Sequence, residues 1–100
     1  MALALCLAPA AQAVETATPQ QGLAVARERC SFCHGVEHGD EFSSNPLAPT
    51  FQMIADTPGM TATALSVTLR SSHQSMPDLM LSSEEIAMIS AYLATLKGGE

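Results

Sequence analysis

The stretch CSFCH at residues 30–34 decides how the chain is to be interpreted. Two cysteines stand three positions apart, and a histidine directly follows the second. Three kinds of chemistry use such a pair: a disulfide redox site, half of a zinc site, or the covalent attachment of a haem. The sequence around the motif has to discriminate between them.

The surrounding sequence favours haem attachment. A redox disulfide of the thioredoxin type lies in a βαβ unit, which is not visible here, and it makes no use of His34. A structural zinc site commonly takes four ligands in two pairs, but His38 and His73, the only other histidines, are not paired with a cysteine. Haem attachment uses the whole motif: the thiols of Cys30 and Cys33 add to the two vinyl groups, and His34 becomes the proximal iron ligand.

The rest of the chain predicts an all-α domain. Helices are expected over 20–30, after Thr61 as N-cap, and after Ser82 as N-cap, because apolar residues recur there at helical spacing. The last helix has the strongest signals: Ser82 and Glu85 form a capping box, Leu81 can pack on Ile86, and Gly98 suits the end. Its apolar stripe consists of Ile86, Ile89, Leu93 and Leu96. Residues 35–58 contain three prolines and many turn formers, so we expect mostly loop, wrapped around something.

The N-terminus predicts export. Residues 1–13 are uncharged, contain a short apolar run and end in Ala11-Gln12-Ala13, which is typical of a signal peptide cleaved after Ala13. We expect a flexible lead-in over 14–20, one domain over 21–97 and a tail over 98–100. The apolar run is too short to cross a bilayer, so no membrane span should remain after cleavage. These features predict a periplasmic protein.

Composition and charge limit the classes of molecule that this protein is expected to bind. Ten acidic and four basic residues give a formal charge of −6, which argues against nucleic acid and anionic membranes. A redox partner protein with a basic docking patch fits better. With three Phe, one Tyr and no Trp, so small a domain would gain from a large apolar cofactor at its centre.

A low-spin electron carrier needs a sixth iron ligand, for which Met76 is the first candidate. Pro77 follows it and favours an extended backbone, and the segment lies between two predicted helices. Met80 is the nearest rival; Leu79 and Leu81 flank it, so a packing role is expected instead. Five more side chains could supply the ligand, namely Met53, Met60, Met88, His38 and His73, of which His73 would give bis-histidine ligation.

Over about residues 21–96 the sequence resembles the class I c-type cytochromes, in particular small bacterial monohaem members. The resemblance rests on CSFCH at 30–34, on MPD at 76–78 and on APTF at 48–51. It implies three to four helices around one covalently attached haem c. Cys30 and Cys33 would form the thioethers, and His34 and Met76 would ligate the iron. The carbonyl of Pro49 would accept the proximal ring N–H.

The resemblance also bears on packing and on function. Gly22 and Tyr92 resemble the contact where the terminal helices cross, while Ala26 stands where the family often has an aromatic residue. The implied function is an exported one-electron carrier between redox proteins, not an enzyme. Two further functions stay open: a haem domain or subunit that serves one dehydrogenase or reductase, and a gas-binding cytochrome with an open sixth position.

Overall fold

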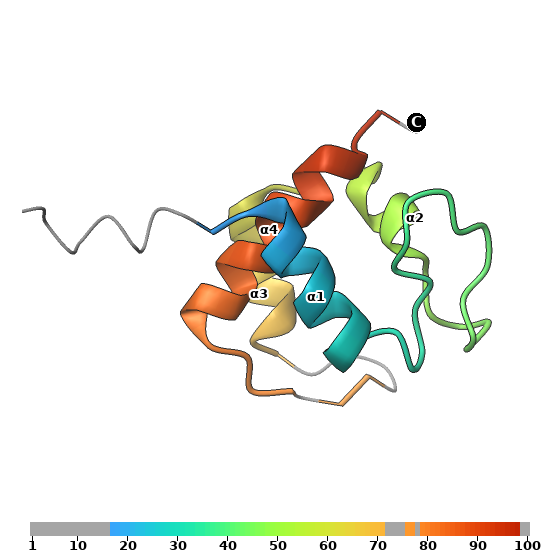
Figure 1. Ribbon diagram of the computed structural model, residues 1–100, viewed down its shortest axis with the longest axis horizontal. Coiled ribbons are helices and arrows are strands. Elements are labelled where there is room, and N and C mark those ends of the chain that lie inside the picture. The colour runs from blue at the N-terminus through green and yellow to red at the C-terminus, as the bar shows by residue number, and fades with distance from the viewer. Residues whose placement is uncertain (1–16, 72–75, 78, 99–100) are drawn as a thin grey trace, which may run out of the picture.

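The computed structural model describes residues 17–71, 76–77 and 79–98 of the chain. The predicted signal peptide, the rival ligand His73 and the last two residues lie outside them. Four helices occur in this part: α1 (Pro19–Arg29), α2 (Phe51–Ala55), α3 (Ala62–Leu69) and α4 (Ser83–Leu96) (Figure 1). The described residues contain no strand among their regular elements, and the predicted all-α class is confirmed.

Each of these helices begins after a hydroxyl side chain that accepts a backbone N–H of the first turn. Thr61 and Ser82 have the predicted role, and Ser82 and Glu85 form the predicted capping box. Thr18 and Thr50 cap α1 and α2, and the Thr18 cap is also a capping box, with Gln21. Caps of this kind contribute about 1 kcal/mol each, because the first N–H groups of a helix lack partners inside it.

Two boundaries differ from the sequence prediction. Thr18 and Pro19, expected in the flexible lead-in, are the cap and the first residue of α1. Proline suits that position because it has no N–H to lose there and its φ is already helical. The segment 35–58 is mostly loop as predicted, but it contains the short helix α2, which was not predicted.

Helices α1 and α4 form the centre of the fold, with α2 and α3 also packed on α4 (Figure 1). Gly22 faces α4 so closely that a Cβ there would lie 1.9 Å from the carbonyl oxygen of Met88. Ala26, one turn further along α1, is fully buried, so the small side chains bring the two backbones together. This confirms the predicted crossing of the terminal helices, with Tyr92 on the other side of the contact.

The predicted apolar stripe of α4 supplies much of the core. Ile86, Ile89, Leu93 and Leu96 are all buried, and Leu81 just before the helix is buried with them. Ile89 and Leu96 are the largest fully buried side chains, so truncating either to alanine should cost about 2–5 kcal/mol. After α4, Gly98 has φ 103°, a conformation that suits glycine at a helix end.

The loop between α1 and α2 extends from the helical core on the side away from α3 (Figure 1). Among the described residues, none of the helices is long and apolar enough to cross a membrane.

Candidate functional site

The CSFCH segment continues from α1 as one tight turn. The amide of Cys30 donates to Ala26 at 2.8 Å, and the amides of Cys33 and His34 both donate to the carbonyl of Cys30, at 3.1 and 2.9 Å. Because the turn follows the helix directly, both thiols and the imidazole end at the wall of the same cavity. Burial raises the pKa of the Cys30 thiol to about 11.

Two cavities of about 260 Å³ each lie beside this turn, and four residues line both of them. These shared residues come from three parts of the chain: Cys30, His34, Pro49 and Met76. The remaining walls are mostly apolar. The first cavity is also lined by Phe32, Cys33, Leu47, Ala48, Pro77 and Leu79, and the second by Phe51, Ile54, Met60, Leu65, Leu69, Ile89 and Leu93.

The imidazole of His34 is oriented by a backbone oxygen. Its Nδ1 lies 2.6 Å from the carbonyl oxygen of Pro49. A carbonyl can only accept a hydrogen bond, so Nδ1 must carry the proton. In the neutral ring the other nitrogen, Nε2, then has a free lone pair, which is the form of histidine that binds a metal.

Backbone hydrogen bonds hold Pro49 in this position. The amide of Asn45 donates to the carbonyl of Cys33 at 3.0 Å, and the amide of Phe51 donates to the carbonyl of Gly35 at 2.8 Å. These two bonds join both ends of the segment 45–51, which contains Pro49, to the residues on either side of His34. Gly35 allows the loop to close tightly, because a Cβ there would lie 2.5 Å from the carbonyl oxygen of Phe42. Phe51 then packs edge-on against the imidazole, with ring centroids 5.8 Å apart.

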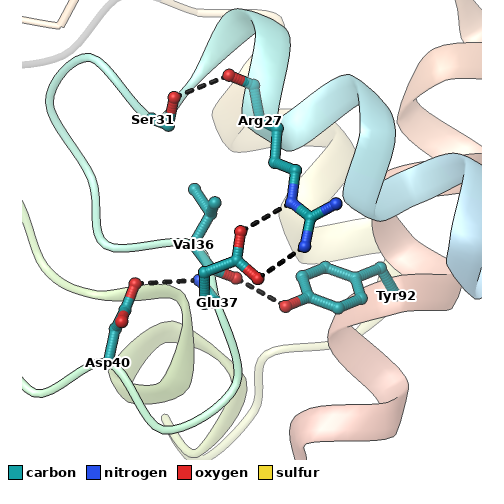
Figure 2. A network of polar contacts seen from close by, with 6 residues as sticks. All are labelled: Arg27, Ser31, Val36, Glu37, Asp40 and Tyr92. Carbon is teal, nitrogen blue, oxygen red and sulfur yellow. Dashed lines mark hydrogen bonds and ion pairs between the residues drawn. The ribbon is translucent and has the colours of Figure 1, made fainter.

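A polar network fixes the residues just after His34 onto α1 and α4. The guanidinium of Arg27 donates to the Glu37 carboxylate at 2.6 and 2.8 Å, and Tyr92 Oη donates to the Val36 carbonyl at 2.5 Å. Figure 2 shows these contacts. Asp40 accepts the amide of Glu37 at 3.0 Å. Arg27 lowers the pKa of Glu37, and burial raises the pKa of Tyr92.

Of the sulfur ligand candidates, Met76 and Met60 reach the cavities. Met76 is half-buried and lines both, and Met60 lines only the second. Met53 is 58% exposed on α2, and Met88 lies on α4 outside the walls of both cavities. His38 is exposed, and it lines neither cavity.

The packing role expected for Met80 is wrong, because its side chain is 81% exposed. Its backbone has φ 56°, in the left-handed region, so the chain turns between Leu79 and Leu81. Leu79 therefore packs against the core and Leu81 is buried, whereas the residue between them points outward. Met80 lines neither cavity.

The structure adds a residue that the sequence did not single out. Arg29, directly before the first cysteine, lines the first cavity and donates to the carbonyl oxygen of Leu79 at 2.8 Å. The sequence shows a basic residue next to the attachment motif, but it does not identify the hydrogen-bond partner, which lies 50 residues away.

The donor set fits a haem. Two thiols, which can add to vinyl groups, line the first cavity together with an imidazole that can offer Nε2 and a thioether, and the rest of the lining is mostly apolar. A metal site of another kind has no comparable support: among the residues that the structure describes, no group of three or more His, Cys, Asp or Glu could hold an ion.

Comparison with known proteins agrees with this fit. Residues 17–93 match the family model described as cytochrome c oxidase, cbb3-type, subunit III. The chain is 30% identical over 95 residues to a cytochrome c-552 of Bradyrhizobium diazoefficiens, which covers 95% of this chain and 90% of that protein. No solved structure matches the chain.

Proposed function

The chain belongs to the monohaem c-type cytochromes of class I and is an electron carrier, and we propose that it works in the periplasm with a haem held by four of its residues and a fifth residue that orients one of them. Cys30 and Cys33 form the thioethers, His34 and Met76 ligate the iron, and the Pro49 carbonyl orients His34. The observation that carries this proposal is that Cys30, His34, Pro49 and Met76 line both cavities.

The bound haem supplies an iron that gains and loses one electron. His34 would offer Nε2, and its hydrogen bond to Pro49 would keep the ring fixed in both oxidation states. Met76 would offer a thioether, which raises the reduction potential relative to bis-histidine ligation. The apolar walls act in the same direction, because a low-dielectric surrounding disfavours the additional positive charge of ferric iron.

Family membership points to electron transfer rather than catalysis, and therefore to redox partner proteins. We propose that the partner presents a basic patch. All four basic side chains of this protein are bonded within the chain: Arg27 to Glu37, Arg29 to Leu79 and Glu85, Arg70 to Ser66 and Ser83, and Lys97 to Met60. Ten acidic residues outnumber these four. Reduction by hexaammineruthenium(II), a cation, should slow as salt is added, whereas oxidation by ferricyanide should accelerate.

Export and covalent attachment are tested together by mass. Protein recovered from a periplasmic fraction of a host that matures c-type cytochromes should have the mass of residues 14–100 plus one haem. The signal-peptide prediction and the two thiols in one cavity support this outcome. Haem that extracts into acid-acetone, or a mass that retains residues 1–13, would contradict it.

Ligation by Met76 is tested by two matched variants. The oxidised protein should show the weak long-wavelength charge-transfer band of sulfur bound to ferric iron. Met76→Ala should abolish the band, lower the potential and open the iron to added ligands. Met80→Ala is the control, because Met80 is exposed outside the cavities. Loss of the band in the Met80 variant alone would overturn the assignment, and an open iron in the wild-type protein would favour a gas-binding cytochrome.

A second candidate function is a haem domain that serves one terminal oxidase. The description of the matched family model, an oxidase subunit, favours it. Purification from native membranes under mild conditions distinguishes the two functions. A free carrier separates from the oxidase and reduces several acceptors, whereas a dedicated domain stays with one complex.

A further inference from the structure

The guanidinium of Arg29 joins three segments at the edge of the first cavity. Arg29 is the last residue of α1, directly before Cys30. Its Nη2 donates to the carbonyl oxygen of Leu79 at 2.8 Å, and its Nη1 lies 3.4 Å from Oε2 of Glu85 on α4. The side chain is only 32% exposed. One cation therefore connects the helix that leads into the attachment motif with the chain that carries Met76.

The bond to Leu79 is placed where it can fix the position of Met76. Leu79 follows Met76 by three residues, and both line the first cavity together with Arg29. The described residues between Met76 and Leu81 form no helix, so no helical hydrogen bonds hold this part of the chain. The left-handed backbone of Met80 lies next to the bonded carbonyl. A charged donor to that carbonyl adds a fixed point in a segment whose described residues contain no helix and, at Met76, only an isolated β-bridge.

We propose that Arg29 is a positioning residue for Met76, acting through the Leu79 carbonyl. The inference rests on the proposed ligation by Met76. Arg29 holds the Leu79 backbone against the end of α1, and so keeps the Met76 sulfur beside the site defined by Cys30 and His34. Its loss releases this part of the chain and leaves the sixth position open more often.

The contact with Glu85 provides a matched control. Glu85 has two roles, because Oε1 accepts the Ser82 amide of the capping box at 2.9 Å while Oε2 faces Arg29. Glu85→Gln keeps an oxygen for the cap and removes the charge. The ion pair is longer than the Leu79 bond and about one-third exposed on both sides, so it contributes little. Removing it should leave the Leu79 bond intact.

The experiment compares wild-type holoprotein with Arg29→Met, Arg29→Gln and Glu85→Gln. Two properties are measured at neutral pH: the charge-transfer band of the ferric protein and the affinity of the ferric iron for imidazole, which competes with Met76. Arg29→Met should weaken the band and raise the imidazole affinity about tenfold to a hundredfold, as expected for the loss of a hydrogen bond to a charged donor. Glu85→Gln should change the affinity less than about threefold.

Each outcome decides the inference. Wild-type imidazole affinity in Arg29→Met overturns it, as does an equal rise in Glu85→Gln, which would assign the effect to the ion pair. If Arg29→Met yields no holoprotein, Arg29→Gln replaces it. The glutamine amide is uncharged and its nitrogen is two bonds nearer the backbone than Nη2 of Arg29, so an affinity equal to wild type there also overturns the inference. A wild-type protein without the band refutes the Met76 ligation itself, and this is seen before any variant is made.

Discussion

Substituting Gly22 with alanine tests the crossing of α1 and α4. In the middle of a helix, alanine is about 1 kcal/mol more favourable than glycine, so an uncrowded site would be stabilised. Here the new Cβ would lie 1.9 Å from the carbonyl oxygen of Met88 and 2.7 Å from Cβ of Tyr92. The carbonyl belongs to the backbone and cannot rotate away, so the helices must separate. Overpacking typically costs about 1–3 kcal/mol. Taking about 3 because the obstacle is rigid, we expect a net loss of about 2 kcal/mol.

The assay is reversible denaturation of the oxidised holoprotein, followed by far-ultraviolet circular dichroism. For a domain of this size, a loss of about 2 kcal/mol lowers the melting temperature by about 8–16 °C. Guanidinium unfolding gives the free energy independently, with the slope showing whether the unfolded state has changed. Spectra of the folded variant show whether the separation reaches the cavities.

Ala24→Gly is the matched control. Ala24 is exposed on the same helix, so this variant measures the helix-propensity contribution alone, a loss of about 1 kcal/mol. A Gly22→Ala protein that is as stable as wild type, or more stable, would refute the close approach of the two backbones. The close approach is supported if Gly22→Ala lowers the free energy of unfolding more than Ala24→Gly does, because helix propensity alone would make the first variant more stable and the second less stable.

Three further predictions concern the polar network, the thiols and pH. Tyr92→Phe removes the hydrogen bond to the buried Val36 carbonyl, and denaturant unfolding should show a loss of about 1–3 kcal/mol in the free energy of unfolding. Burial raises the pKa of Tyr92, so the stability that its neutral form contributes is present below pH ~10 and is lost as pH rises through the folded pKa. The difference in stability between wild type and Tyr92→Phe should therefore shrink in alkali. Cys30→Ala with Cys33→Ala should give a poorly ordered chain without haem, and a cooperative melt at the wild-type midpoint would contradict this. Arg27 lowers the pKa of Glu37, so at low salt their ion pair should raise the free energy of unfolding above pH ~4.3, and this contribution should be lost as pH falls through the folded pKa. Denaturant unfolding at several pH values should show this pH dependence in wild type but not in Glu37→Gln, and high salt should remove it from wild type.

The features that the sequence predicted well are those encoded locally. The capping box and stripe of α4 involve residues three or four positions apart, and both are present in the structure. The close approach at Gly22 came from the family resemblance, since no local pattern identifies the partner of a buried glycine. Helix α2 was missed because its five residues are too few to show a period, and its cap directly follows a proline.

The features that could not be predicted depend on contacts distant in sequence or on an unusual backbone. Arg29 meets Leu79 and Glu85 across 50 and 56 residues, so neither partner is visible from its neighbourhood. Met80 was expected to pack because its neighbours are apolar, but a left-handed φ between them reverses the outcome. Side-chain alternation assumes an ordinary backbone, and such a residue breaks it.

The bond between His34 and Pro49 spans only 15 residues, whereas that between Arg29 and Leu79 spans 50. Short loops close at lower entropic cost and sooner, so the two halves of the site differ in when they can form during synthesis. The attachment motif and the turn that orients its histidine are complete once residue 51 has emerged, before α4 exists to pack on α1. A chain that emerges from its N-terminus therefore presents its two thiols and its imidazole before the cavity wall that α4 supplies, with Ile89 and Leu93, has been made.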